Sequence, residues 1–446
     1  MERNLPVAHR FQTVLVLPVR DIPARNRLRI ASRRIRFALC LLAGALVAGA
    51  ASPAMPQALA SKARATTAGT VPPPFTVPAG KAIRPFQGRG MWIWMLSSSD
   101  GGRLGSIIAQ AKAHGVSTLF IKSGDGTSMW SQFNRTTVAA LHHAGLRVCA
   151  WQYVYGNHPV FEADVGVQAV RDGANCLVID AEVEYQGKYV QAQAYIRTLR
   201  KKIGYRFPIG LAGFPWVDYH PAFPYSVFLG PHAAQVNVPQ MYWKDIGTTV
   251  VNVYAHTYQW NELYQRPIAP LGQLYSNPPL TEIRRFRAIS RYYRAPNVSW
   301  WDWQSAGSLQ WNAMSQAVGT IPGFVAHREA ATVGPGSQGD WVVWAQEHLI
   351  SAGYRVTIDG DYGTSTTAAV ERFQTAHGLP ATGELDPATW DSLLRYHVAT
   401  VTWVTRKGQP VAETASGARR EIVVPRSAHL RERRDELAGA PGRGRP

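Results

Sequence analysis

The chain has 446 residues, enough for two or three domains, and its 46% hydrophobic content with fifteen Trp supports a large buried core. The formal net charge of +18 is uneven. Residues 1–60 hold nine Arg against two acidic residues, a net +7, and residues 400–446 hold ten Lys or Arg against five, a net +5, which leaves +6 for the middle. A mildly basic middle without a basic helix or an aromatic-basic motif argues against nucleic-acid binding.

Residues 1–60 have the pattern of a secretory signal with a long basic lead. An Arg-rich segment at 25–36 precedes an uncharged apolar run at 37–51, and Ala-x-Ala sites follow. About fifteen apolar residues are short for a bilayer span, so we expect no integral membrane span in the mature protein; an uncleaved anchor is the alternative. Residues 61–87, rich in Ala, Thr and Pro, indicate a semi-rigid spacer.

Residues 88–323 alternate between strand-like and helix-like segments. Predicted strands are Met91–Met95, Val116–Lys122, Leu146–Tyr153, Cys176–Glu182, Pro208–Phe214, Gln235–Trp243, Ile268–Tyr275 and Val298–Gln304. Predicted helices are Leu104–His114, Thr136–His143, Phe161–Arg171, Lys188–Lys202, Thr248–Tyr264, Leu280–Arg294 and Leu309–Val318. The link after the fifth strand is the least helical. Eight repeats predict an α/β fold, a (β/α)8 TIM barrel. An open doubly wound sheet is the alternative, but no Gly-rich phosphate loop follows the first strand.

The fourth predicted strand ends in acidic residues. Asp180 and Glu182 follow a buried apolar run, and residues two apart on a strand share a face. Because unpaired carboxylates are costly to bury, we expect the pair at a mouth, the placement that acids need for glycosidic-bond cleavage. A strand that simply runs out into a solvated loop is the plain alternative. With Glu184 the acids could instead bind a hard cation, although no further acidic cluster supports a metal site.

Polar and aromatic residues gather at the carboxyl ends of the other predicted strands, where the active residues of a barrel lie. We expect Gln240 and Tyr242 to share one face, and Trp300, Asp302 and Gln304 another. Trp faces pack on sugar rings while polar groups bind the hydroxyls. The other candidates for substrate binding are Lys122, Trp151, Tyr153, Trp216, Asp218 and Trp243.

Cys149 and Cys176 both fall in predicted strands. A disulfide fits an exported protein, and two buried thiols fit equally well. No Cys/His spacing indicates zinc, and the sequence implies no metal and no cofactor.

Residues 334–396 carry the most specific motif of the chain. The segments Asp359-Gly-Asp-Tyr-Gly363, Phe373-Gln374 and Thr389-Trp390 resemble the peptidoglycan-binding module, a small three-helix domain whose first helix would be Asp340–Ala352. Most of the motif forms turns and core, so glycan binding is what the resemblance implies.

The barrel resembles family-18 chitinases and family-25 lysozymes. The resemblance lies in Asp180-Ala-Glu182, in Gln240-Met-Tyr242 and in the Trp-rich last strand. It departs at Val178, where the chitinase pattern has another Asp, and at the first strand, which lacks the Asp of the lysozymes. Only Glu182, Asp180 and Tyr242 are therefore carried over as catalytic candidates.

Together these features predict an exported hydrolase of cell-wall glycan containing N-acetylhexosamine, secreted and associated with the wall. The resemblance implies Glu182 as general acid, Asp180 as the group that orients the substrate's 2-acetamido group, and Tyr242 as a hydrogen-bond partner of that acetamide. A non-catalytic wall-binding protein with a degenerate barrel is the alternative. The expected partner is peptidoglycan or another cell-wall polysaccharide, and we expect a monomer. Residues 400–446 are expected to be a basic, disordered tail.

Overall fold

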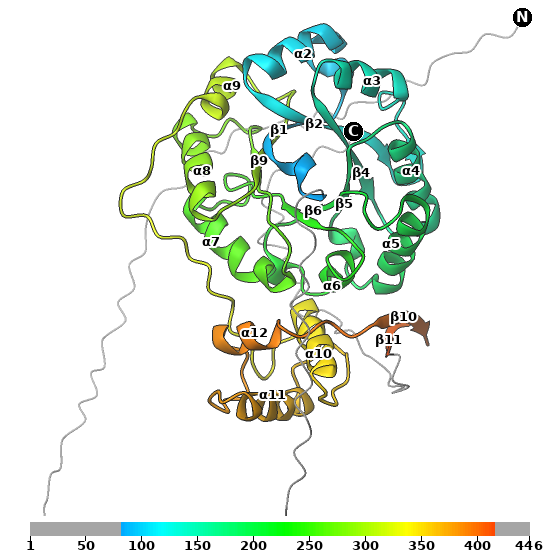
Figure 1. Ribbon diagram of the computed structural model, residues 1–446, viewed down its shortest axis with the longest axis vertical. Helices are drawn as coiled ribbons and strands as arrows, with labels where there is room; N and C mark the ends of the chain where they lie inside the picture. The colour runs from blue at the N-terminus through cyan, green and yellow to red at the C-terminus, as the bar shows by residue number, and fades with distance from the viewer. Residues whose placement is uncertain (1–81, 415–446) are drawn as a thin grey trace, which may run out of the picture. The chain divides into compact units, whose positions relative to one another are not determined.

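The computed structural model describes residues 82–414 (Figure 1). The predicted signal sequence, most of the predicted spacer and the end of the predicted tail lie outside the described residues. The described residues all belong to one compact unit. Among them, no helix is both long enough and apolar enough to cross a bilayer.

Eight parallel strands form the barrel that the sequence predicts. Neighbouring strands pair in the order β7-β6-β5-β4-β2-β1-β9-β8. Parallel bridges from Asn237 to Ile268 and from Gln240 to Leu271 join the two end strands, so the circuit closes. A short strand, β3, pairs antiparallel with the end of β2. The bounds are β1 Gly88–Ile93, β2 Val116–Asp125, β3 Ser128–Met129, β4 Arg147–Val154, β5 Cys176–Ala181, β6 Ile209–Gly213, β7 Val236–Pro239, β8 Leu271–Gln273 and β9 Asn297–Trp301.

Helices lie around the outside of the strands (Figure 1). The link after β6 contains only a 3-10 turn and the four-residue α6, which confirms that this link is the least helical. The helices are α2 Leu104–Ala113, α3 Arg135–His143, α4 Pro159–Arg171, α5 Tyr189–Ile203, α6 Tyr225–Phe228, α7 Val250–Asn261, α8 Leu280–Tyr292 and α9 Ser308–Ser315.

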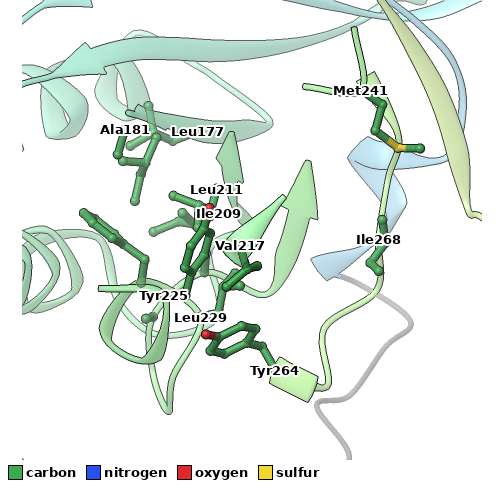
Figure 2. Close-up of a cluster of buried hydrophobic side chains, with 14 of the residues drawn as sticks. Leu177, Ala181, Ile209, Leu211, Val217, Tyr225, Leu229, Met241, Tyr264 and Ile268 are labelled. Atoms are coloured by element: carbon green, nitrogen blue, oxygen red, sulfur yellow. The ribbon is translucent and has the colours of Figure 1, made fainter. Parts of the chain in front are cut away.

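Two apolar cores result from the alternation of side chains along each strand. One lies inside the barrel and includes Val178 of β5. The other fills the layer between strands and helices and includes Leu177 and Ile179 of the same strand; Figure 2 shows part of it. Phe86 belongs to the inner core, with its ring centroid 6.1 Å from that of Phe120. It enters from the 3-10 turn Arg84–Phe86, just before β1.

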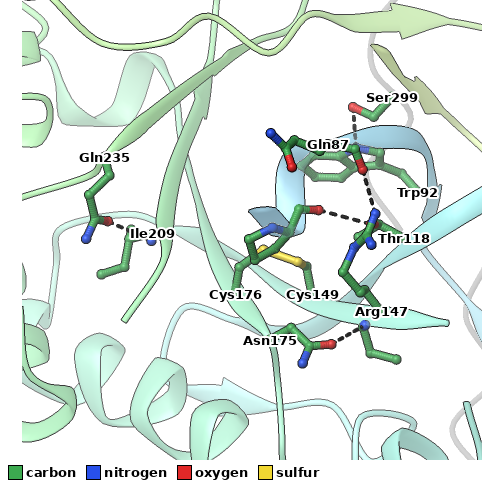
Figure 3. Close-up of a disulfide and its surroundings, with 12 residues drawn as sticks. Gln87, Trp92, Thr118, Arg147, Cys149, Asn175, Cys176, Ile209, Gln235 and Ser299 are labelled. Atoms are coloured by element: carbon green, nitrogen blue, oxygen red, sulfur yellow. Dashed lines mark hydrogen bonds between the residues drawn. A yellow bond between two sulfur atoms is a disulfide. The ribbon is translucent and has the colours of Figure 1, made fainter. Parts of the chain in front are cut away.

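Cys149 and Cys176 form a disulfide, which decides between the two alternatives left open by the sequence (Figure 3). The two residues are register partners on the neighbouring strands β4 and β5, with Cα atoms 4.6 Å apart. Both side chains lie in the inner core. The disulfide therefore joins adjacent strands inside the barrel.

Three further helices, α10 Asp340–Ser351, α11 Thr364–Ala376 and α12 Pro387–Leu393, confirm the predicted three-helix module. Two glutamines hold its turns. The Gln346 side-chain amide donates to Asp359 (2.7 Å), and its oxygen accepts from the N–H groups of Asp359 and Gly360, both at 3.0 Å. Gln374 donates to Thr389 (3.1 Å) in the same way. These motif residues are structural, as the sequence indicated.

The first residue of α10 contacts the barrel through a buried carboxylate. Asp340 accepts hydrogen bonds from the backbone N–H and the hydroxyl of Ser226, both at 2.7 Å, and from the Tyr264 hydroxyl at 2.8 Å. One turn further along, the Trp344 indole N–H donates to the Leu263 carbonyl (2.7 Å). The module therefore packs on the barrel through polar contacts that are removed from water.

The prediction of a disordered tail over residues 400–446 is wrong for the first part of that segment. Residues 401–414 form an antiparallel hairpin of β10 Val401–Arg406 and β11 Gln409–Thr414. Trp403 is buried, with its ring 4.2 Å from that of Tyr189 on α5. The prediction followed the high charge of the whole segment, but its first part is rich in β-branched residues and has an apolar side to bury.

Candidate active site at the carboxyl end of the barrel

Two acidic side chains converge on one amide at the end of β5. The Gln240 side-chain nitrogen donates to Asp180 Oδ1 (2.9 Å) and to Glu182 Oε1 (3.0 Å), so these two oxygens lie within about 6 Å of each other. Asp180 continues the inward-facing row of β5 and is 6% exposed, whereas Glu182 follows the strand and is partly exposed. The spacing of the two acids predicts this convergence; Gln240 reaches them from the end of β7.

Two tyrosines extend this polar group along the rim. Tyr153 of β4 is the register partner of Asp180, and its hydroxyl donates to Glu184 (2.8 Å). Burial and the negative charges of Glu182, Glu184 and Asp180 raise the pKa of Tyr153 well above its usual range. The hydroxyl therefore stays protonated and acts as a donor. The Tyr155 ring lies 5.0 Å from that of Tyr153.

Lys122 occupies an aromatic cage on the neighbouring strand β2. Its ammonium nitrogen lies 2.6 Å from Asp125, 4.4 Å from the ring centre of Trp130 and 5.0 Å from that of Trp151. The side chain is only 6% exposed. Cation–π attraction and the ion pair compensate for the loss of water around the ammonium group. The Tyr155 hydroxyl donates to the other oxygen of Asp125 (2.8 Å), which links the cage to the rim tyrosines.

Four indoles from three strands form what we call the tryptophan cluster: Trp92, Trp94, Trp151 and Trp301. Trp301 lies centrally, with ring-centre distances of 5.2 Å to Trp151, 6.0 Å to Trp92 and 6.5 Å to Trp94. The indole nitrogens of Trp92 and Trp151 donate to protein oxygens, whereas that of Trp94 is buried without a partner. Trp92 and Trp151 are fully buried, whereas Trp94 and Trp301 are partly exposed, so only the last two present a surface that could pack on a sugar ring.

Asp302 follows the cluster at the end of β9. Burial raises the pKa of its carboxyl, which is 4% exposed and accepts from the backbone N–H of Ser305 at 3.2 Å. In the amide orientation that satisfies both neighbours, Gln304 donates to Asp302 Oδ2 (3.0 Å) and accepts from the backbone N–H of Met95 (2.8 Å). Gln304 thus connects the ends of β9 and β1.

Tyr242 lies inside the barrel with the residues of the inner core and is 8% exposed. Its ring meets that of Tyr275 edge to face, with centres 5.4 Å apart. Like Gln240, it follows β7, and both side chains lie on the inner side of the barrel.

The placement expected for Trp243 and Trp300 is wrong. Both are fully buried in the layer between strands and helices, where each stacks or tilts against Phe286 of α8, with ring centres 5.0 and 5.4 Å away. The Trp243 indole also donates to Glu282 (2.8 Å). The alternation along β9 points Trp300 outward and Trp301 inward. Because β9 ends at Trp301, Asp302 does not share a face with Trp300 as the spacing predicted.

Trp216 and Asp218 follow β6 but contact α7. Trp216 stacks on His256 at 4.4 Å between ring centres, and Asp218 Oδ1 lies 2.7 Å from His256 Nε2. These contacts join the β6 loop to α7, on the outside of the barrel strands.

Several residues of the site were not among the candidates from the sequence, and Tyr155, Trp130 and Trp301 show why. Tyr155 stands two residues beyond Tyr153, and the same-face rule applied one step past the strand end would have found it. Trp301 lies beside Trp300, which the sequence analysis selected as the substrate-binding candidate. No local pattern in the sequence indicates Trp130, because only the hairpin of β2 and β3 brings its side chain close to Lys122. Among the described residues, no group of three or more His, Cys, Asp or Glu side chains could hold a metal ion.

Comparisons with known proteins identify the module. Residues 338–393 match the family described as "Putative peptidoglycan binding domain". The chain contains a peptidoglycan-binding domain. A zinc D-Ala-D-Ala carboxypeptidase of Streptomyces albus G is 38% identical over 84 residues, which are 18% of this chain and 31% of that protein. The chain therefore spans about a third of that relative's length.

Solved structures resemble the two parts separately. A peptidoglycan-binding protein of Clostridioides difficile is 43% identical, with 14% of this chain and 40% of that chain covered and a TM-score of 0.14. A GH18 chitinase from Pseudoalteromonas aurantia resembles the barrel at 10% identity, with 50% of this chain and 97% of that chain covered and a TM-score of 0.38. The barrel assignment itself follows from the strand order and the closing bridges.

Proposed function

We propose that the barrel is a glycoside hydrolase of cell-wall polysaccharide containing N-acetylhexosamine, and that the peptidoglycan-binding domain holds it on its substrate. The observation that carries the proposal is the convergence of Asp180 and Glu182 on the Gln240 amide at the carboxyl end of the strands. That end is where catalytic residues of such barrels lie. The predicted export of the chain agrees with a substrate outside the cell.

Glu182 is the general acid of this proposal, because it is the more exposed of the two acids and can approach the leaving glycosidic oxygen. Asp180, more deeply buried, orients the substrate's 2-acetamido group as its oxygen attacks the anomeric carbon. Gln240 holds both carboxylates in register. Tyr242 binds the acetamide, Asp302 binds a hydroxyl, and the partly exposed Trp94 and Trp301 pack on the sugar ring.

The proposed mechanism predicts retention of anomeric configuration. The nucleophile is the substrate's own acetamide, so the anomeric carbon is inverted twice, once when the acetamide oxygen displaces the leaving group and once when water opens the intermediate. We therefore expect the β-anomer to be released from a β-linked glycan.

The test is release of reducing ends from purified peptidoglycan and from chitin oligosaccharides. We expect Glu182→Gln to lower the rate by a factor of about 10² to 10⁴, the usual contribution of a general acid. The matched control is Glu329→Gln, an exposed glutamate that should leave the rate unchanged. Equal rates for the two variants, or no turnover by the folded wild type on either substrate, would refute the assignment.

A non-catalytic wall-binding protein remains the second candidate, and one observation favours it: Val178 occupies the inward position of β5 where family-18 chitinases have another Asp. Sedimentation with insoluble wall, run beside the rate assay, separates the two functions. Binding without turnover selects the second candidate, whereas turnover that is lost in Glu182→Gln with binding retained selects the first.

A further inference from the structure

A cavity of about 340 Å³ opens at the amino end of β1 and β9, the end of the barrel opposite the acids. Three arginines line it: Arg89 of β1, and Arg287 and Arg291 of α8. We call it the arginine pocket. The rest of the lining contains no acidic residue and consists of Gly88, Gly115, Ser290, Val298, Trp300 and Val318.

The arginines have a structural role that explains part of this arrangement. Arg89 donates to the carbonyls of His114 and Ser315, at the carboxyl ends of α2 and α9. Arg287 donates to the carbonyls of Ala313 (2.9 Å) and Gln316 (2.5 Å). Because the last carbonyls of a helix have no partner within it, these bonds satisfy groups that would otherwise be unpaired.

The hydrogen bonds to backbone carbonyl groups leave the arginines with uncompensated positive charge and with unused N–H donors. A guanidinium group has five N–H donors, and Arg287 uses only Nη1 toward protein oxygens, so Nε and Nη2 keep three. Arg291 uses only Nη1, toward Val318. Within residues 82–414 none of the three pocket arginines pairs with a carboxylate. Carbonyl dipoles compensate only part of three full positive charges.

The positive charges of the arginines in this region repel one another. Burial and the neighbouring Arg89, Arg291 and Arg284 lower the pKa of Arg287 to about 10, and no carboxylate opposes them. Gly115 leaves room for the Arg89 guanidinium, since a Cβ there would lie 2.7 Å from its Nη1. Like charges held together in a cavity without a protein counter-charge constitute a site for an anion.

We propose that the arginine pocket binds a phosphate-type oxyanion. Several oxygens on one centre match donors that arrive from three guanidinium groups, and arginine forks bind phosphate with paired hydrogen bonds. The same chemistry occurs in a free phosphate ion and in a phosphodiester of an anionic polymer. This site is separate from the acids at the carboxyl end, so its occupation does not depend on the proposed hydrolase activity.

The experiment is calorimetric titration of the full chain with inorganic phosphate at low ionic strength, against sodium chloride at matched ionic strength. We expect saturable binding of one phosphate, weakened at least tenfold in Arg287→Gln. Arg285→Gln is the matched control, because Arg285 is exposed on the same helix and does not line the pocket. Equal phosphate affinity in the two variants, or wild-type binding no stronger than that of chloride, would overturn the proposal.

A second variant keeps the test decisive if Arg287→Gln does not fold. Arg291→Gln loses a single carbonyl bond, to Val318, and should also weaken phosphate binding, with the helix content unchanged in circular dichroism. A parallel titration with dimethyl phosphate separates the two sources. Binding of inorganic phosphate alone assigns the pocket to a free ion, binding of both extends it to a phosphodiester chain, and binding of neither refutes the pocket as an anion site.

Discussion

Two groups of carboxylates in this protein differ in how their charge is satisfied. At the carboxyl end of the barrel, Asp180 and Glu182 share the Gln240 amide, and Glu182 is partly exposed to solvent. At the contact between barrel and module, Asp340 is fully buried and accepts hydrogen bonds from Ser226, Tyr264 and Tyr189.

The difference separates an acid with a structural role from the two acids that we propose as catalytic. A fully buried acidic side chain surrounded by donors stabilises the contact that it makes. Two acidic side chains that converge on one amide, with one of them partly exposed to solvent, can approach a bound substrate, as acid–base chemistry requires. Both groups consist of acidic residues at the end of a secondary-structure element, β5 for the pair and α10 for Asp340, so composition alone does not distinguish them.

The largest effect on stability is expected from Asp340→Ala. The change leaves the Ser226 N–H, the Ser226 hydroxyl and the Tyr264 hydroxyl without an acceptor in a buried place. Each unsatisfied buried donor costs about 1–3 kcal/mol, so we expect the free energy of unfolding in urea to fall by roughly 3–5 kcal/mol. Hydrolytic activity per folded molecule should not change.

The control for this prediction is Asp391→Ala, which removes an exposed carboxylate of α12 and should alter the free energy of unfolding by less than about 0.5 kcal/mol. If Asp340→Ala were no more destabilising than this control, the contact between module and barrel would not depend on the buried acid.

The sequence predicts the barrel, the three-helix module and the meeting of Asp180 with Glu182, because each follows from periodicity or spacing within one segment. It does not predict Gln240 as their common donor, since that contact joins β5 to β7 across the barrel. Trp243 and Trp300 show a second limit. Both faces of a barrel strand are apolar, so an aromatic residue gives no indication of which core it enters.

Replacing Gln240, the shared donor, should impair the pair of acids at the carboxyl end of the barrel without affecting Asp340. Gln240→Met keeps a similar volume and removes the amide, so Asp180 and Glu182 face each other within about 6 Å without it. The two acids then lose a donor that fixes their positions. If they act as proposed, we expect hydrolysis to slow by about 10- to 100-fold.

Gln259→Met, which replaces an exposed glutamine on α7, is the matched control for the rate of hydrolysis. Equal rates in the two variants would mean that the Gln240 amide is not needed to position the acids.

The smallest effect concerns how stability depends on pH. Burial raises the pKa of Asp340 to about 6, so its stabilising contribution is complete below about pH 4 and is lost as the pH rises through about 6. Asp340→Asn cannot titrate, and its stability relative to wild type should therefore improve by on the order of 1 kcal/mol between pH 4 and pH 7.

His348 should make stability depend on pH in the opposite direction. Burial lowers its pKa to about 3, so its stabilising contribution is present above about pH 6.5 and is lost as the pH falls toward 3. His348→Asn should accordingly gain stability relative to wild type as the pH falls. Parallel stability curves for wild type and both variants in urea would show that neither group changes its protonation on folding.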